Sequence, residues 1–184
     1  MVLRGMGVYM TTDGFVNDGG DAGFEVAPFQ GEKALTGALE RCIIDACEQG
    51  VNTLCFCDVD FAWWPLSNER VIEAMTGWAR SASNQRRLTV VAATYSMIER
   101  EHGVWKRWRR NWNHRVQCLQ IEPEFDANLP CVFWSEKLML TVQNRETCVW
   151  GVSLDKQGLV VMRQRLEELK KCCVEAFPAT TLGL

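Results

Sequence analysis

Two carboxylates directly follow an almost wholly apolar run, a position where binding and catalytic residues are common. Asp58 and Asp60 follow residues 53–57, which have the length and apolarity of a strand covered on both faces. Ligands of open α/β sheets gather at the carboxyl ends of strands, so this pair could hold Mg²⁺ or act as nucleophile and acid. The same side chains could instead accept backbone N–H groups in the turn before Pro65. No later strand ends in a second acidic pair that would complete a metal site, and we therefore favour the turn.

A cluster of basic and aromatic residues lies between residues 105 and 115. Trp105, Trp108 and Trp112 stand at i, i+3 and i+7 and so share one face of a helix. The basic side chains of this segment that we predict to bind an anion are Lys106, Arg109, Arg110, His114 and Arg115. Such a cluster can bind phosphates by charge and stack on bases. A tryptophan stripe at helical spacing is more often part of the core, with arginines solvated on the opposite face, and this alternative stays open.

The motifs of common enzymes are absent from the sequence. It contains no GxSxG, GxGxxG, HExxH or CxxC, and neither of its two histidines has a partner at metal-ligand spacing. The nine cysteines are odd in number and lie within apolar runs, which indicates buried, reduced thiols in a cytosolic protein. We therefore lean towards a protein that is not an enzyme, with no cofactor and no bound metal.

Length and composition place the chain among ordinary globular domains. It has 184 residues, of which 47% are hydrophobic and 23% are charged, which suits one domain with a sizeable core. The formal charge of −3 argues against a wholly basic nucleic-acid binder but permits a local basic patch. No apolar run approaches the roughly 18 residues of a membrane span, and the N-terminus lacks the apolar region of a secretory signal. We expect a cytoplasmic protein without a membrane partner.

The elements that must position these residues alternate between strand and helix. Residues 1–23 are rich in glycine and are expected to form a flexible leader before a single domain over residues 24–184. Apolar periodicity predicts strands at 24–29, 53–57, 88–95, 116–121, 131–134, 138–142 and 148–152. It predicts helices at 31–49, 69–80, 96–113 with a bend at Gly103, and 158–176, followed by a docked tail over 177–184. This order predicts an α/β fold with a mixed, mostly parallel sheet, helices on both faces, and a C-terminal β-hairpin plus helix.

Three stretches give the chain a family resemblance. They are residues 60–66 (DFAWWPL), 105–114 (WKRWRRNWNH) and 177–184 (FPATTLGL). With these stretches the chain resembles a family of uncharacterised proteobacterial proteins, which implies a bacterial domain of unknown role. The order of elements between residues 88 and 177 also resembles one half of a phospholipase D-like domain. That superfamily carries its catalytic HxKxxxxD at the start of the hairpin, whereas residues 130–134 here are PCVFW, so the resemblance implies a catalytically silent relative that keeps a binding cleft.

These observations favour a non-enzymatic binding or interaction protein. Its contact surface would include the basic helix and the exposed aromatic residues that we expect at Trp63, Trp64 and Trp105. A homodimer and a phosphate-containing ligand are the partners that fit this hypothesis. Two alternatives stay open. One is a Mg²⁺-dependent phosphate-ester hydrolase or phosphodiesterase that uses Asp58 and Asp60, and the other is a single-stranded nucleic-acid binder whose affinity falls steeply with salt.

Overall fold

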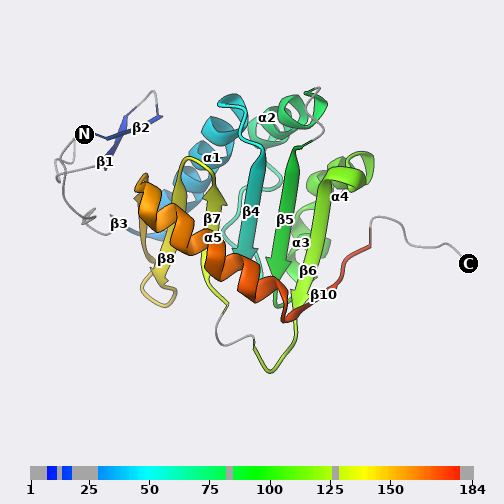
Figure 1. Cartoon of the computed structure of the whole chain (residues 1–184). Coiled ribbons are helices and arrows are strands. Elements are labelled where there is room, and N and C mark those ends of the chain that lie inside the picture. Colours follow the sequence, from blue (N-terminus) through cyan, green and yellow to red (C-terminus); the bar gives the residue numbers. More distant parts are fainter. Residues whose placement is uncertain (1–7, 12–13, 18–28, 82–84, 126–128, 179–184) are drawn as a thin grey trace, which may run out of the picture.

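The computed structural model describes residues 8–11, 14–17, 29–81, 85–125 and 129–178 (Figure 1). Near the N-terminus, β1 (Val8–Thr11) and β2 (Gly14–Asn17) pair as an antiparallel two-stranded sheet. The leader that we expected over residues 1–23 therefore contains a hairpin, and its other residues lie outside the described part of the chain. The same holds for most of the strand expected at residues 24–29.

The other described strands form one open sheet of eight strands, in the order β10-β6-β5-β4-β7-β8-β9-β3. Their bounds are β3 (Phe29–Gln30), β4 (Thr53–Asp58), β5 (Arg87–Ala92), β6 (Val116–Ile121), β7 (Cys131–Ser135), β8 (Met139–Asn144), β9 (Val149–Ser153) and β10 (Cys173–Glu175). The strands β4, β5 and β6 run parallel, and the other neighbouring pairs in this sheet are antiparallel. The sheet is mixed, as predicted. The prediction that it is mostly parallel is wrong, because among the described strands only β4, β5 and β6 pair in parallel, whereas tight turns join β7, β8 and β9 into an antiparallel meander.

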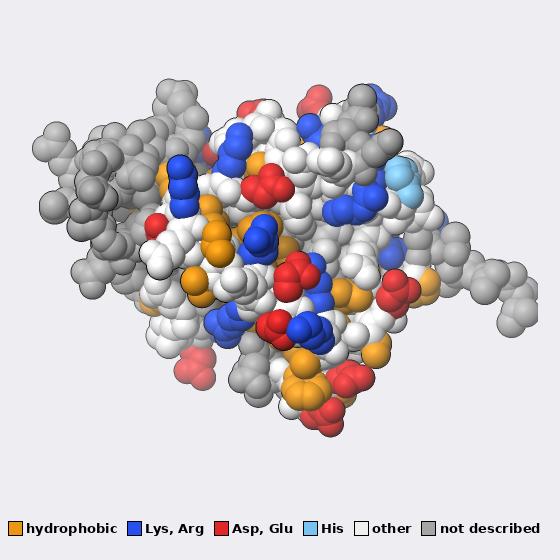
Figure 2. All heavy atoms as spheres, in the orientation of Figure 1, with side chains coloured by type: hydrophobic (Ala, Val, Ile, Leu, Met, Phe, Trp, Pro, Cys, Tyr) orange, Lys and Arg blue, Asp and Glu red, His pale blue; other side chains and the backbone are white. Residues whose placement is uncertain are grey.

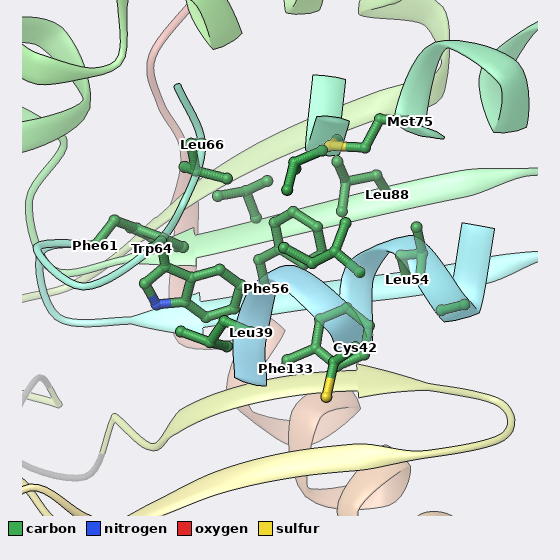
Figure 3. Packing of buried hydrophobic residues seen from close by; sticks show 14 of the residues in the cluster. Leu39, Cys42, Leu54, Phe56, Phe61, Trp64, Leu66, Met75, Leu88 and Phe133 are labelled. Carbon is green, nitrogen blue, oxygen red and sulfur yellow. The ribbon is translucent and has the colours of Figure 1, made fainter. Parts of the chain in front are cut away.

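Helices cover both faces of this sheet, as predicted (Figure 1). They are α1 (Glu32–Glu48), α2 (Glu69–Arg80), α3 (Ser96–Glu101), α4 (Gly103–Asn111) and α5 (Lys156–Lys170), with a 3-10 turn, η1, at Asn113–Arg115. The helix α5 lies on one face, and the other four lie on the opposite face. Side chains alternate along β4, so Leu54 and Phe56 enter the core under α1 and α2 while Cys55 and Cys57 face α5 (Figure 3). None of the described helices is long and apolar enough to cross a membrane.

Two segments differ from the predicted elements. The single long helix expected before β6 is broken into α3 and α4 at His102, whose backbone (φ −109°, ψ 45°) leaves the helical region. The break falls directly before Gly103, where the sequence predicted a bend. The last helix ends at Lys170 rather than at residue 176, because the chain then turns and residues 173–175 pair with β6 as the edge strand β10.

Candidate anion-binding groove

The acidic pair at the end of β4 is bound by Arg145, which lies in the turn between β8 and β9. Asp58 is fully buried, and its carboxylate accepts hydrogen bonds from the Val59 N–H (2.6 Å) and the Trp64 Nε1–H (2.7 Å). Arg145 donates to the same carboxylate and, through its other terminal nitrogen, to Asp60. Asp60 also accepts a backbone N–H two residues further on, at 3.0 Å. One guanidinium therefore balances two carboxylates, and backbone N–H groups of the turn bind to both.

This arrangement has the character of a structural turn. Both oxygens of Asp58 are engaged, so a Mg²⁺ ion would have to displace Arg145 and leave its charge unbalanced. Within the described ranges, no group of three or more His, Cys, Asp or Glu side chains is placed to hold a metal ion. Sequence reasoning named both carboxylates but missed Arg145, because 87 positions separate it from Asp58 and no local pattern links the two.

Two of the three tryptophans expected on an exposed surface are buried. Trp64 is 2% exposed because its indole N–H satisfies the Asp58 carboxylate beside the core (Figure 3). Trp105 is fully buried because the apolar face of α4 packs into the main core cluster, as the core interpretation of the tryptophan stripe predicts. The prediction that these two residues form an interaction surface is therefore wrong. Trp63 is partly exposed, and the Arg145 Cζ lies 4.6 Å from its ring centroid.

Arg109 of α4 is a buried cation without a described counter-ion. It is only 6% exposed, yet among the described residues no carboxylate lies within ion-pair distance of its guanidinium. Its Nε–H donates to the Cys118 Sγ at 2.9 Å, and its Cζ lies 5.3 Å from the ring centroid of Phe177. Burial raises the pKa of the Cys118 thiol by more than Arg109 lowers it, so the thiol stays neutral. The positive charge of Arg109 is therefore not balanced by the groups that hold it.

Arg109 lines a groove of about 550 Å³ at the carboxyl ends of the parallel strands β5 and β6. The residues that line it are Thr94, Tyr95, Ser96, Glu99, Lys106, Arg109, Arg110, Gln120, Phe177 and Pro178. Lys106 and Arg110 stand one helical turn apart on α4, about 6 Å along its axis. The groove therefore collects three cations and several hydroxyl groups against one carboxylate, which is a suitable lining for an anion.

Two stacked aromatic rings form part of the groove. The rings of Tyr95 and Phe177 lie 4.9 Å apart, with 11° between their planes. Tyr95 is anchored because its hydroxyl lies 3.0 and 2.9 Å from the carbonyl oxygens of Val90 and Leu119, on the neighbouring strands β5 and β6. Phe177 has a φ of 50°, a left-handed backbone that costs about 1 to 3 kcal/mol in a residue with a Cβ. Its ring contacts offset that cost and hold this part of the tail at the groove, while residues 179–184 lie outside the described part.

The structure divides the predicted anion-binding residues into two groups. Lys106, Arg109 and Arg110 meet in the groove. His114 and Arg115 instead line a second hollow, at the amino ends of β4, β5 and β6. Sequence proximity grouped them, but the chain turns between α4 and η1 and separates the two sets. Sequence reasoning missed Thr94, Ser96, Gln120 and Phe177 as groove residues. The first three are uncharged polar residues without a motif, and the contacts of Phe177 with Tyr95 and Arg109 form only when the tail folds back on the domain.

Comparison with known proteins yields a likeness in fold. No protein-family model matches the chain, and no curated protein matches it. A solved structure with a similar fold is that of TrmBL2, an archaeal chromatin protein, which is described as showing a novel mode of DNA binding. The TM-score is 0.59 at 10% sequence identity, and the match covers 81% of this chain and 53% of that one. This chain therefore spans about half the length of TrmBL2 and shares its fold, while the resemblances to a proteobacterial family and to a phospholipase D-like domain stay predictions.

Proposed function

We propose that this chain is a non-enzymatic binding domain whose groove takes phosphate groups of a nucleic acid. The observation that carries the proposal is the buried guanidinium of Arg109, which has no carboxylate partner among the described residues. A charge inside a protein is costly unless an opposite charge and hydrogen bonds compensate it. A phosphate oxygen in the groove would supply the opposite charge, and the planar fork of arginine suits phosphate geometry.

The neighbouring side chains support a phosphate ligand. Lys106 and Arg110 add two cations from the same helix. The Thr94 hydroxyl donates to that of Ser96 at 3.2 Å, which leaves the Ser96 hydroxyl to donate to a phosphate oxygen. Glu99 is the carboxylate in this lining, so positive charge is in excess. The groove also lies where open α/β sheets usually bind ligands, at the carboxyl ends of parallel strands.

The fold likeness favours nucleic acid as the source of the phosphate. TrmBL2 is a chromatin protein that binds DNA, and its fold is similar to that of this chain. The net charge of −3 means that binding must depend on the local groove rather than on the field of the whole protein. Affinity should therefore be modest and sensitive to a few named side chains.

The competing hypothesis is a Mg²⁺-dependent hydrolase that uses Asp58 and Asp60. Because Arg145 binds both carboxylates, this hypothesis needs a rearrangement of the turn between β8 and β9 before a metal ion could enter. It predicts that Mg²⁺ produces cleavage of a phosphate diester. A binding domain predicts unchanged oligonucleotide in the presence of Mg²⁺.

The experiment is a fluorescence anisotropy titration of a labelled oligonucleotide, repeated between about 50 and 200 mM salt. Arg110→Ala removes a groove cation, and Arg107→Ala is the matched control, since Arg107 is exposed on the same helix and does not line the groove. With three phosphate contacts, the slope of log affinity against log salt should be about −2 for a single strand. Arg110→Ala should weaken binding and make that slope shallower by about 0.7, the share of one contact to a single strand.

Equal effects of Arg107→Ala and Arg110→Ala would show a diffuse attraction to the helix and contradict a groove. Absence of salt-dependent binding by the wild type would contradict the proposal altogether. Cleavage of the oligonucleotide with Mg²⁺, abolished by Asp58→Asn, would establish the hydrolase in its place.

A further inference from the structure

A second basic hollow lies at the opposite end of the same parallel strands. It has a volume of about 590 Å³, and its lining includes the cations Arg87, Arg115 and Lys170 against one carboxylate, Glu175, together with Thr89 and His114. Its floor belongs to the sheet face that carries α5, because Thr89 pairs in register with Cys55, which packs on that side. Figure 2 shows this face, with a histidine beside several Lys and Arg side chains at its upper right.

Thr89 offers a hydroxyl group to this hollow. It is 7% exposed, and its side-chain hydroxyl makes no hydrogen bond to the part of the chain that the structure describes. The hydroxyl oxygen reaches the surface of the hollow, where it can donate a hydrogen bond to a ligand. Lys170 also lines the hollow, and its ammonium group pairs with Glu167 at 2.7 Å. The combination of a hydroxyl donor and a lining with more cations than carboxylates suits a phosphate oxygen.

Two aromatic rings lie along the chain between the groove and this hollow. The rings of Trp112 and His114 have centroids 6.0 Å apart and are tilted by 45°. Trp112 is half-buried, His114 is exposed, and His114 itself lines the hollow. Arg110, which lines the groove, precedes His114 by four residues, so their Cα atoms are at most about 14 Å apart. Aromatic faces between two basic sites are the arrangement by which proteins bind unpaired bases.

We propose that the ligand is a single-stranded nucleic acid that binds across both sites. One part of its backbone lies in the groove at Arg109, a base stacks at Trp112 and His114, and a further phosphate enters the hollow at Thr89 and Lys170. This inference rests on the proposed function, since it extends the strand from the same groove. Single strands are required because the bases of a duplex are stacked on one another and cannot present a face to a side chain.

The test compares labelled single strands of about 4 and about 12 nucleotides, within the range of known single-strand sites, with a duplex of the longer sequence. Trp112→Leu keeps an apolar side chain but removes the stacking face, and Lys170→Ala removes a cation from the hollow. Lys171→Ala is the matched control, because Lys171 pairs with Glu168 as Lys170 pairs with Glu167, but it does not line the hollow. His114→Ala provides a second substitution, at an exposed residue outside the core.

The longer single strand should bind more tightly than the shorter one and than the duplex. Trp112→Leu and His114→Ala should each weaken binding of the longer strand by about fivefold or more and leave the shorter one unchanged. Lys170→Ala should act in the same direction, and Lys171→Ala should have no effect. Equal affinity for both lengths, or tighter binding of the duplex, would overturn the inference while Arg110→Ala still weakens binding and supports the groove. If Arg110→Ala has no effect on any of the ligands, the proposed function fails, and this inference fails with it.

Discussion

The guanidinium of Arg109 lies over the ring of Phe177, with its Cζ 5.3 Å from the ring centroid. The two residues are far apart in sequence, one on α4 and the other in the tail after β10. The ring of Phe177 also stacks with those of Trp105 and Tyr95, and Tyr95 is anchored to β5 and β6. A cation held by an aromatic ring and a neutral thiol, rather than by a carboxylate, keeps its charge available to a ligand.

Removal of the Phe177 ring should affect both stability and binding. Phe177→Ala should lower the free energy of unfolding by about 2 kcal/mol, less than for a fully buried ring because Phe177 is partly exposed. It should also weaken oligonucleotide binding, since Arg109 loses the surface that orients it. Urea denaturation and anisotropy measure the two effects. Phe177→Leu should retain much of the stability, and an alanine variant that binds like the wild type would contradict the role given to the ring.

The buried carboxylate of Asp58 should be important for stability rather than for metal binding. Asp58→Asn places an NH₂ group against donors such as the Trp64 indole and leaves Arg145 without its buried partner, which should cost about 2 to 4 kcal/mol. Asp60→Asn is the control and should cost less than about 1 kcal/mol, because Asp60 is partly exposed. Urea denaturation with and without Mg²⁺ tests both points. If Mg²⁺ raised the urea concentration at which half of the wild-type protein is unfolded, this account of Asp58 and Asp60 would be contradicted.

Much of the fold could be predicted from periodicity, but its long-range pairing could not. Local apolar spacing predicted β4 to β6 and a bend at Gly103, beside the observed break at His102, because those signals lie within a few residues of each other. The antiparallel strands β7, β8 and β9 join the sheet because β7 pairs with β4. The strand β10 forms because the chain returns to β6 after α5. No local pattern encodes either pairing, and this is why a mostly parallel sheet was expected.

The candidate site shows the same division. The basic residues of α4 could be recognised as a cluster, whereas the special environment of Arg109 could not. That environment depends on Cys118 from β6 and Phe177 from the tail, neither of which carries a recognisable motif. The expected exposure of Trp64 failed for a related reason, since its burial depends on a hydrogen bond to Asp58 across the turn.

The protein should lose stability in mild acid through His102. This residue joins α3 and α4, and its ring nitrogens lie 3.3 Å from the Ser67 hydroxyl and 3.4 Å from the Phe61 carbonyl oxygen. Burial lowers its pKa from the ordinary value of 6.5, although the Phe61 carbonyl and Glu101 favour the charged ring. The unfolded chain therefore binds the proton more readily, and stability falls as the pH drops below about 6.5 towards the folded-state pKa.

Urea denaturation at several pH values between about 7.5 and 5 measures this dependence. His102→Gln cannot be protonated in this range, so it should remove part of the fall. An identical pH profile for the variant and the wild type would contradict the assignment to His102.

The buried thiols should react slowly in the native protein. Burial raises the pKa of both Cys47 and Cys55 to about 12, from an ordinary value of 9.0. Because the thiolate is the reactive form, these two should react with a thiol reagent at least about a thousandfold more slowly than in the unfolded chain. Mass spectrometry of alkylated peptides, with and without denaturant, identifies the modified residues. Rapid native labelling of Cys55 would contradict the packing of β4 under α5.

The measurement that tests the central claim most directly is the affinity of Arg109→Met for a labelled single-stranded oligonucleotide. Methionine has a similar volume and no charge, so the variant should be as stable as the wild type or more so, because a buried unbalanced cation is removed. A loss of affinity is then not a loss of folding. The account predicts an affinity at least about tenfold weaker than that of the wild type, the loss expected for one well-placed charged contact. A folded Arg109→Met variant that binds as tightly as the wild type would contradict the account.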